Sequence, residues 1–510
     1  MVKYQYNEEV KNMYHKVSRD PVYSEIMLYP VEIMIIDTKA MQRLRYLSQL
    51  VGAEYVYPGA THTRFAHSLG VMHLSGVYAE HLYDTPDKVR ILRLAGLLHD
   101  IGHGPFSHQF DDVVYKRLGF SDGHDEFRMK LLREYFPKEL RKKYEEAPTT
   151  LKKAVLEDLE ITLGELSQNM EENFTQLMEE VIKVYEGENT GTIDFAVVQG
   201  PLGADRLDFV LRDSYYAGTR GFGTGSIDRL IRNSKIVEKD GRPLLAYDSK
   251  VVDEIYTILF GRFMMYKNVY FHKTSRAADM MIQELLDLSY KALKLDERVM
   301  DINTFLDLTD QTIINEVIVG FYNIVEQYGG GEEIKEALLK YEIDLQPLEL
   351  DMVMAYEIVE RLKSRNLWKV ILETPFSIEG VDPTLVSQGI AGDLLQKIRL
   401  RLERSLEIAD EEDTKIIKHV LSNFDEIFKI DTPYKLTVIH PEEFLRSNIY
   451  ILKKHHIMTF DEYVRHYPAY NFMKSNLIQI IRIYVTKDIR EILEKYKILP
   501  ETSVEITTRW

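Results

Sequence analysis

The segment KVRILRLAGLLHD, residues 88–100, constrains the fold of this chain more than any other. Apolar side chains surround almost the whole of Lys88–Leu98, which predicts a helix that is buried on all sides. Two ionisable residues, His99 and Asp100, follow directly. A buried carboxylate without a partner is costly, so a metal ion or a cationic side chain is expected beside it. The chain is therefore expected to fold around a polar site inside a helical core.

Helical periodicity dominates the rest of the first 295 residues. Met72–Leu82 has apolar residues at spacings of three and four, and another helical block runs from about 251 to 293. The charge-rich segment 138–188 repeats short helical patterns, and we interpret it as an exposed helical insertion. The turn dipeptide Asp240–Gly241 separates two short extended runs and predicts a β-hairpin.

The sequence changes character beyond Asp296. Helical stretches continue, but three β-branched and apolar segments predict strands: Leu367–Leu372, Tyr434–His440 and Val504–Thr508. We therefore predict a mostly α fold, with a helical core and a small β-hairpin in residues 1–295. An α+β region in residues 296–510 follows it, with an expected role in oligomerisation or regulation.

The composition removes several kinds of chemistry. The 510 residues include no Cys, which excludes disulfides, thiolate zinc sites and cysteine nucleophiles, so any transition metal must be held by His and carboxylates. The formal net charge of −17 counts against nucleic acid as a partner, because surfaces that coat nucleic acids are basic. A charged N-terminus and the lack of a long apolar run predict no signal peptide and no membrane span, and hence a cytoplasmic protein.

Histidines are concentrated in one part of the chain, where eight of the 15 lie within residues 62–124. His67 shares a helical face with apolar residues, and Asp205 lies on a second helix as another carboxylate that can point inward. With His99 and Asp100 they form a set of two His and two Asp, which suits Mn, Fe, Mg, Ni or Zn with open positions for water. Such a metal makes water a nucleophile at neutral pH.

Further histidines follow the apolar helix. His103 and His108 occur in GHGPFSH, a Gly- and Pro-rich stretch that can turn their rings back toward the site, and His124 precedes an amphipathic helical run. Histidines near the metal would serve as phosphate donors or as the general acid for a leaving oxygen. We interpret His73 and His81 as structural residues.

At these residues the chain resembles the HD-domain phosphohydrolases, specifically the deoxynucleoside triphosphate (dNTP) triphosphohydrolase branch. Five similar blocks are spread in order over most of residues 20–280: DTKAMQRLRYLSQLVGAEYVYPGATHTRFAHSLGVMHLSG, LAGLLHDIGHGPFSHQFD, GHDEF, ADRLDFVLRDSYYAG and YKNVYFHK. The resemblance implies an HD domain in residues 1–295 that hydrolyses dNTPs to deoxynucleoside and inorganic triphosphate with a divalent metal. It also implies a homo-oligomer, a dimer or a tetramer.

The resemblance further implies roles for individual residues. The metal ligands it implies are His67, His99, Asp100 and Asp205. The residues around the α-phosphate are His103, His108 and His124, with Asp111 orienting His108, and either His124 or His108 protonates the leaving 5′ oxygen. The cations on the phosphate side are Arg64, Arg206, Arg262 and Lys267. Around the sugar, Gln49 and Leu50 lie against the ring, Asp213 accepts the 3′-hydroxyl, and Tyr270 crowds the 2′ position.

Three more residues match an activating site that reads GTP or dGTP: Asp37, Gln42 and Arg45. The alternative is that they belong to an ordinary amphipathic helix with a capping Asp. Two departures from the family affect substrate choice. Phe209 replaces a Tyr whose hydroxyl would contact the substrate, and Phe271 replaces a residue that is polar in some relatives near the base.

Two other functions remain open. One is an HD-type phosphodiesterase or nucleotidase that acts on oligonucleotides, cyclic nucleotides or monophosphates, and the replacement at Phe209 keeps it open. The other is a nucleotide-sensing scaffold in which the metal is structural. The reaction product separates the two enzymes, and loss of function in a His99→Ala or Asp100→Ala variant separates both from the scaffold.

Overall fold

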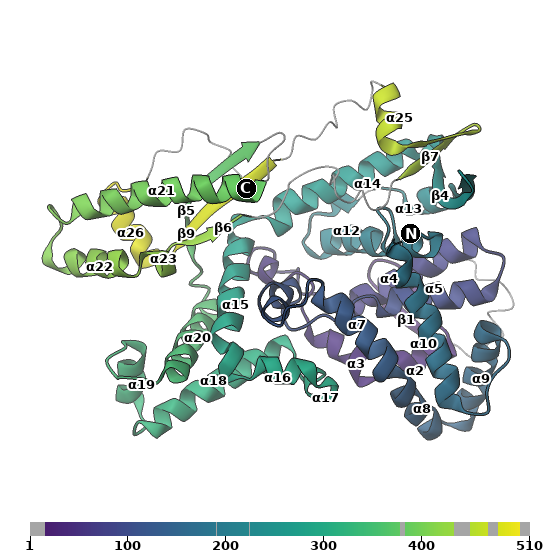
Figure 1. Cartoon of the computed structure of the whole chain (residues 1–510), viewed down its shortest axis with the longest axis horizontal. Helices are drawn as coiled ribbons and strands as arrows, with labels where there is room; N and C mark the ends of the chain where they lie inside the picture. Colours follow the sequence, from purple (N-terminus) through teal and green to yellow (C-terminus); the bar gives the residue numbers. More distant parts are fainter. Residues whose placement is uncertain are drawn as a thin grey trace.

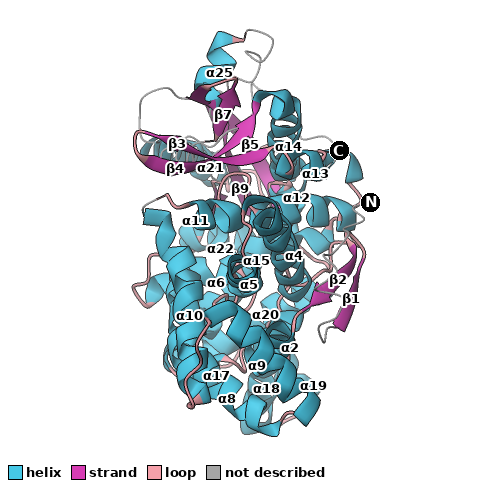
Figure 2. Cartoon of the chain, turned by 90° about the vertical axis from the view of Figure 1, so that its right-hand side faces the viewer, coloured by secondary structure: helices cyan, strands magenta, loops and turns pink. Residues whose placement is uncertain are grey.

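The computed structural model describes residues 16–189, 191–223, 225–377, 383–432, 449–467 and 478–499. Its secondary structure is mainly helical with small sheets, as the sequence predicts (Figure 2). Two of the three predicted strands, Tyr434–His440 and Val504–Thr508, lie outside the described residues. The third, Leu367–Leu372, is confirmed as the start of strand β5 (Lys369–Ser377).

The described chain begins with a hairpin that the sequence did not indicate, β1 (Lys16–Asp20) and β2 (Ser24–Leu28), paired from Lys16 opposite Leu28 to Asp20 opposite Ser24. The helices that follow this hairpin form the part of the fold that contains His99 and Asp100. They are α2 (Pro30–Ile36), α3 (Lys39–Arg43), α4 (Arg64–Leu82), α5 (Pro86–Leu98), α6 (His108–Phe110), α7 (Gly123–Glu134), α8 (Phe136–Glu146), α9 (Thr149–Leu163), α10 (Met170–Glu186), α11 (Ile193–Gln199) and α12 (Ala204–Tyr216).

Helices α4 and α5 form the centre of this part, and α12 packs across α4. Both central helices are buried along most of their length, which confirms the burial expected for Lys88–Leu98. They approach closely at Gly96, where an added Cβ would lie 2.8 Å from the carbonyl oxygen of Val71. The helix ends that carry the polar site are therefore held by tight backbone packing.

The prediction that segment 138–188 is an exposed insertion is wrong, because α8, α9 and α10 each bury residues, and α10 buries the most. Phe174, Leu177 and Val181 are fully buried, and α10 packs against α5, α7 and α8. These residues lie three and four positions apart and form one apolar stripe, while the charged residues between them face solvent. The high charge content of the segment concealed this stripe.

The predicted hairpin is confirmed as β3 (Ser234–Lys239) and β4 (Arg242–Asp248), with Asp240 and Gly241 at φ of 56° and 75° in the turn. It belongs to a four-stranded sheet of order β3-β4-β7-β8, in which β7 (Tyr450–Lys453) pairs parallel to β4 and β8 (His456–Thr459) pairs antiparallel to β7. The helical block predicted from about 251 to 293 is also confirmed, as α14 (Val252–Met265) and α15 (Lys273–Ala292). A short helix, α13 (Ile227–Ile231), precedes the hairpin.

Long helix α15 lies between the α4–α5 part and the later part of the chain (Figure 1). The later elements are α16 (Leu295–Met300), α17 (Ile302–Phe305), α18 (Asp310–Gln327), α19 (Glu332–Leu339), α20 (Pro347–Lys363), α21 (Pro383–Ser405), α22 (Glu411–Ser422), α23 (Phe424–Ile427), β6 (Lys429–Asp431), α25 (Phe460–His466), β9 (Ile478–Val485) and α26 (Lys487–Lys495). Strand β9 pairs antiparallel with both β5 and β6.

The hydrophobic side chains form two main clusters. The larger one runs from the N-terminal hairpin through Phe305, Tyr356 and Trp368, so helices α16–α20 share the core of the α4–α5 part. A separate cluster contains Leu372, side chains of α21, α22 and α26, and Ile483 of β9. The predicted α+β character of the later region is thus clearest in the part of the chain that forms this separate cluster. The domain boundary near residue 296 stays a prediction.

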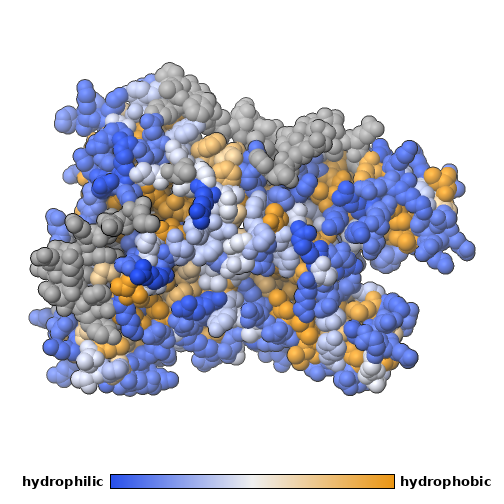
Figure 3. Space-filling view, turned by 180° about the vertical axis from the view of Figure 1, so that it is seen from behind, coloured by the Kyte–Doolittle hydropathy of each residue, from blue (hydrophilic) through white to orange (hydrophobic). Residues whose placement is uncertain are grey.

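The surface is mainly hydrophilic, with separate hydrophobic patches on the face seen in Figure 3. In the part of the chain that the structure describes, no helix has the length and apolar character needed to cross a bilayer.

Candidate active site

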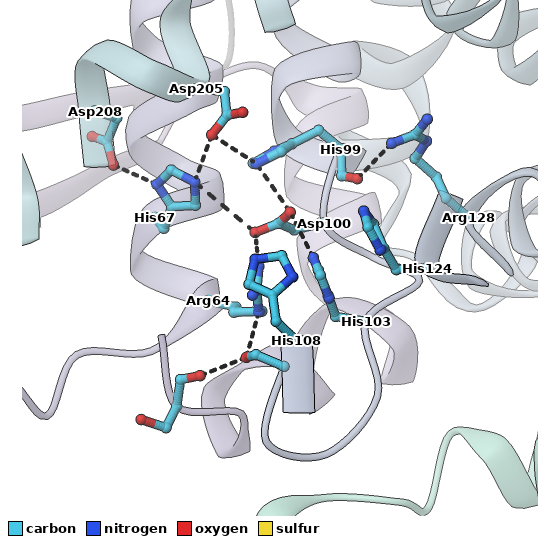
Figure 4. Close-up of polar contacts among 12 residues, drawn as sticks. Arg64, His67, His99, Asp100, His103, His108, His124, Arg128, Asp205 and Asp208 are labelled. Carbon is cyan, nitrogen blue, oxygen red and sulfur yellow. Dashed lines mark hydrogen bonds and ion pairs between the residues drawn. The ribbon is translucent and has the colours of Figure 1, made fainter. Parts of the chain in front are cut away.

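Four of the predicted site residues meet where three helices converge (Figure 4). His67 lies on α4, His99 and Asp100 directly follow α5, and Asp205 lies in the first turn of α12. The Nε2 atom of His67 is 3.2 Å from Oδ1 of Asp205 and 3.9 Å from Oδ2 of Asp100. The Nε2 atom of His99 is 3.3 Å from Oδ1 of Asp100 and 3.7 Å from Oδ1 of Asp205. We call these four residues the metal half of the site.

The metal half is buried and negatively charged. The side chains of His67 and His99 are each 2% exposed, and that of Asp205 is 24% exposed. Burial would raise the pKa of Asp100, but Arg64, His99 and His103 hold it well below its usual range. Although burial opposes a charge on His67, its hydrogen bonds to Asp205 and Asp208 raise its pKa to about 10. Carboxylates that favour a proton in this way also favour a bound cation.

A second layer of residues orients His67. Its Nδ1 atom lies 2.7 Å from Oδ2 of Asp208, and since a carboxylate only accepts, Nδ1 carries a hydrogen and Nε2 is the nitrogen that would give up its proton to a bound cation. Asp208 is held in turn by the Nε of Arg212 at 2.9 Å and the hydroxyl of Tyr23 at 2.7 Å. Arg212 also donates to Asp20 at the end of β1, so the N-terminal hairpin supports the metal half.

His99 provides the test of whether a metal fits. Its Nδ1 atom donates to the carbonyl oxygen of Gly96 at 2.8 Å, which leaves Nε2 as the atom with a lone pair. This Nε2 is buried and makes no hydrogen bond with any residue that the structure describes. His67, His99 and Asp100 each offer one ligand atom within 4.8 Å of the others, which is the donor set of a divalent transition metal. The residues therefore fit a divalent metal, whose identity the donor set leaves open.

Three predicted histidines gather around Asp111, beside the metal half. The Oδ2 atom of Asp111 lies 3.1 Å from Nδ1 of His108, 3.1 Å from Nδ1 of His124 and 3.5 Å from Nδ1 of His103. The rings of His103 and His124 stack with centroids 4.1 Å apart. Asp111 thus orients all three rings, where the sequence predicted this role for His108 alone. We call these four residues the histidine half.

The histidine half is more open than the metal half and divides its charge unevenly. Burial, followed by the charges of Arg64 and His124, lowers the pKa of His103 to about 4, so its ring is neutral at pH 7. Burial opposes a charge on His124, but the hydrogen bond to Asp111 raises its pKa above the usual value. The side chain of His108 is 69% exposed. The cluster therefore offers one favoured proton carrier, His124, next to an accessible ring.

Arg64 joins the two halves. One guanidinium nitrogen donates to Oδ2 of Asp100 at 2.5 Å, and Nε donates to the hydroxyl of Ser107 at 2.7 Å. Ser107 lies in the loop between His103 and His108. The Arg64 side chain is only 3% exposed and is already hydrogen-bonded to Asp100 and Ser107. Its role as a phosphate-side cation stays a prediction.

The predicted sugar-side residues also lie together. Oδ1 of Asp213 is 2.7 Å from Nε2 of His62, and Oδ2 accepts a hydrogen bond from the hydroxyl of Tyr270 at 2.5 Å. Leu50 and Tyr270 pack against one small apolar cluster of Ala53, Met265 and Val269. Gln49, which is also predicted to lie against the sugar, donates its backbone N–H to the carbonyl oxygen of His62. Phe209 faces Tyr270 with ring centroids 6.5 Å apart.

The other predicted cations lie on nearby elements but make different contacts. Arg206 donates to the carbonyl oxygens of Gln199 and Gly200, at the end of α11. Arg262, on α14, stacks over the ring of Tyr266 at 5.5 Å from its centroid. Lys267 lies in the π-helical turn Tyr266–Tyr270, a kind of turn that is frequent at functional sites. Their roles toward phosphate stay predictions.

The three predicted guanine-reading residues surround the turn between α2 and α3. Asp37 is exposed at the end of α2. Gln42 donates to the carbonyl oxygen of Ile36 at 2.8 Å, and its own Oε1 accepts from Nε of Arg45 at 2.8 Å. Arg45 also stacks over Phe65 at 3.6 Å from the ring centroid, next to Arg64 of the site. The turn is accessible and adjoins the site helix, and nothing more about regulation follows from its contacts.

Several supporting residues were missed from the sequence. Asp208 had a signal, because it lies three residues after Asp205 and four before Arg212 on one helix. His62 belongs to the histidine-rich region, but the sequence predicted no role for it. In the structure its Nε2 atom contacts Oδ1 of Asp213. Asp310 had no local signal, since it follows His108 by about 200 residues and accepts its hydrogen bonds here from the backbone N–H groups of Ser48 and Phe106.

Comparison with known proteins gives a family context. A family model described as HD domain matches residues 64–185, and one described as HD associated region matches residues 226–318. An uncharacterised protein of Methanocaldococcus jannaschii is 29% identical over 334 residues, which cover 66% of this chain and 62% of that protein. Human deoxynucleoside triphosphate triphosphohydrolase SAMHD1 is 26% identical over 389 residues, which cover 70% of this chain and 55% of that protein.

A solved structure, that of a hypothetical protein from Aquifex aeolicus, matches with a TM-score of 0.58 and 25% sequence identity, covering 95% of this chain and 100% of that one. The match extends beyond the HD domain, so the likeness in fold includes most of the later region. The chain spans less than two thirds of the length of the two curated relatives.

Proposed function

We propose that this chain, which carries an HD domain and an HD-associated region, is a metal-dependent phosphohydrolase that converts dNTPs to deoxynucleoside and inorganic triphosphate. One observation supports this most: the buried residues His67, His99 and Asp100, with Asp205 beside them, adjoin a histidine cluster organised by a single carboxylate, Asp111. The first group fits a divalent cation and the second fits proton transfer. Together they provide what hydrolysis of a phosphate ester requires.

The metal half would hold the cation through two imidazole nitrogens and two carboxylates. When bound, a divalent cation supplies activation of water and neutralisation of charge on phosphate oxygens. The protein's own residues do the rest. Asp208 keeps the Nε2 atom of His67 directed inward, the carbonyl of Gly96 does the same for His99, and Arg64 neutralises part of the charge of Asp100.

The reaction replaces the bond between the α-phosphorus and the 5′ oxygen with a bond between the α-phosphorus and the oxygen of water. The 5′ oxygen leaves with the electron pair and needs a proton. His124, whose charged form Asp111 stabilises, is the proposed donor, and exposed His108 is the alternative donor. Asp213 would accept the 3′-hydroxyl while Tyr270 crowds the 2′ position, which would favour deoxyribose.

We include activation by GTP or dGTP at Asp37, Gln42 and Arg45, and a homo-oligomeric state, in the same proposal. The support is that Arg45 is exposed and packs on Phe65, the neighbour of Arg64 in the site helix. A nucleotide bound at this turn would contact the helix that carries His67.

A second enzymatic function keeps some support. The ring of Phe209 carries no hydroxyl where the resembling triphosphohydrolases have one, and it faces Tyr270 beside the proposed sugar site. A phosphodiesterase or nucleotidase would use the same metal and histidine halves but a different position of the phosphate chain.

The test is product identification. Purified protein is supplied with Mn²⁺ or Mg²⁺ and incubated with each dNTP, alone and with GTP, and the products are separated by ion exchange. Deoxynucleoside and triphosphate are the expected products. Monophosphate or phosphate would instead support the second function, and no turnover in a metal-loaded protein would support the nucleotide-sensing scaffold.

A further inference from the structure

The loop between His103 and His108 contains an unfavourable backbone conformation. Phe106 and Ser107 are consecutive residues with a φ of 57° each, although neither is glycine. A left-handed conformation costs a non-glycine residue roughly 1–2 kcal/mol, and it persists only where the surrounding structure imposes it. The side chains of both residues are buried. Contacts from outside the loop must therefore hold this pair in place.

Asp310, the first residue of α18, supplies one of these contacts. Its Oδ1 atom accepts a hydrogen bond from the backbone N–H of Phe106 at 2.6 Å, and its Oδ2 atom accepts one from the backbone N–H of Ser48 at 2.8 Å. One carboxylate thus binds two backbone segments at once. It comes from the HD-associated region, whereas the loop belongs to the HD domain.

The second contact is made by the Ser107 side chain. Its hydroxyl accepts from Nε of Arg64 at 2.7 Å and donates to the carbonyl oxygen of Ser48 at 2.7 Å. Since Arg64 also donates to Asp100, a continuous series of hydrogen bonds runs from Asp310 through Ser48, Ser107 and Arg64 to the metal half.

The position of Asp310 is itself fixed. Thr309 caps α18 through a capping box with Thr312, and Arg43 donates from Nε to the carbonyl oxygen of Leu308 at 2.8 Å. The guanidinium of Arg43 also lies over the ring of Phe305, 4.3 Å from its centroid. The start of α18 is therefore held rigidly enough to position a partner.

We propose that Asp310 is a positioning residue for the histidine half: by fixing the Phe106–Ser107 turn it sets where His103 and His108 lie relative to the metal half. It acts through backbone N–H groups and touches no reacting atom. The catalytic part of this inference rests on the proposed function, while the structural part does not.

The test compares Asp310→Asn with Asp307→Asn. The amide keeps one acceptor oxygen but turns a donor toward the second N–H, so one of the two backbone bonds is lost. Asp307 lies three residues earlier and is the matched control, because it pairs with Lys39 at the surface, where the two side chains are 61% and 52% exposed. Hydrolysis, bound metal and backbone amide exchange are measured for both variants.

Asp310→Asn is expected to lower kcat by about 10- to 100-fold, the usual cost of a small misplacement of catalytic groups, while KM changes less than about threefold. The bound metal should stay at the wild-type level, and the amide of Phe106 should exchange about tenfold faster or more. Asp307→Asn should match the wild type in all three measurements. Unchanged kcat and unchanged exchange at Phe106 in Asp310→Asn would overturn the proposal.

A second variant decides the matter if Asp310→Asn does not fold. Ser107→Ala removes the other contact to the turn without altering α18, so it should lower kcat and speed exchange at Phe106 while keeping the metal. A folded Ser107→Ala variant with normal kcat would then overturn the proposal. The exchange readout needs no turnover, so a wild type that hydrolyses nothing would refute the proposed function while exchange still tests the position of the turn.

Discussion

The metal half and the histidine half of the site are built in opposite ways. Each residue of the metal half lies on a helix or directly at its end, the two histidines are 2% exposed, and a second layer around Asp208 orients His67. The histidine half lies on a loop with two left-handed residues, on short helical turns and on the first turn of α7, and His108 is 69% exposed. The difference indicates that one half is made to keep its geometry and the other to meet a ligand.

Close helix packing explains the rigid half. An added Cβ at Gly70 of α4 would lie 1.9 Å from Oδ1 of Asp208, so only glycine allows this carboxylate to reach behind His67. The histidine half is also closely packed at one point, because an added Cβ at Gly102 would lie 1.9 Å from the carbonyl oxygen of His124. It depends in addition on hydrogen bonds that Asp111 and Asp310 accept and that Arg64 donates. If this comparison is correct, changes in the first half should remove the metal, and changes in the second should spare it.

The largest effect is expected for the metal half itself. His99→Ala removes a ligand atom, so metal affinity should fall more than about 100-fold, beyond the range typical for second-layer partners, and hydrolysis should disappear. Metal content after dialysis and dNTP hydrolysis check this, with His81→Ala on α4 as the control. A His99→Ala protein that retains both its metal and its activity would remove the distinction between the halves.

The next largest effect is expected at the centre of the histidine half. Asp111→Asn keeps the size of the side chain but weakens its hold on three rings, so kcat should fall about 10²- to 10⁴-fold, the usual contribution of acid–base catalysis. Bound metal should not change. Asp112→Asn is the matched control, because the neighbouring Asp112 forms an exposed ion pair with Lys116. Loss of metal in Asp111→Asn would show that the two halves are one unit.

A smaller effect is expected in the second layer of the metal half. Asp208→Asn should weaken metal binding by about 10- to 100-fold, because Nδ1 of His67 loses its carboxylate partner. It also leaves Arg212 with Asp20 as its remaining carboxylate, so thermal unfolding is measured alongside metal titration. Metal affinity equal to that of the wild type in a folded variant would refute the orienting role of Asp208.

The smallest effect concerns stability and contrasts two histidines of one helix. His73 lies on α4 with His67, but burial, followed by the charge of Arg93, lowers its pKa to about 3. Because the folded state resists protonation and the unfolded state takes up a proton near pH 6.5, stability should fall as pH drops from about 6.5 toward 3. The loss at pH 5 is roughly 2 kcal/mol.

Urea unfolding at pH 7.5 and pH 5 measures this loss, with His73→Phe as the comparison because Phe keeps the ring beside Tyr23. The variant should lose about 2 kcal/mol less than the wild type between the two pH values. Equal losses would mean that His73 is not held neutral in the core.

Local patterns predicted what depends on local structure. The helices at 72–82 and 88–98, the hairpin at Asp240–Gly241 and the strand at Leu367–Leu372 all follow from periodicity and turn residues. The predicted metal ligands also meet, because a His-Asp pair at the end of a buried helix has to find partners.

What the sequence missed depends on long-range contacts. The parallel pairing of β4 with β7 joins residues about 200 apart, and Asp310 reaches Phe106 over a similar separation. The burial of α10 was missed for another reason: its apolar stripe of Phe174, Leu177 and Val181 lies among many charged residues. No rule of local spacing predicts which carboxylate will hold which backbone N–H.

The most direct test of the central claim is hydrolysis of a dNTP in H₂¹⁸O by the metal-loaded protein, with mass spectrometry of the products. If the two halves act together at the α-phosphorus, the triphosphate should contain one ¹⁸O atom and the deoxynucleoside none. Label in the deoxynucleoside, or monophosphate or free phosphate in place of triphosphate, would contradict the account.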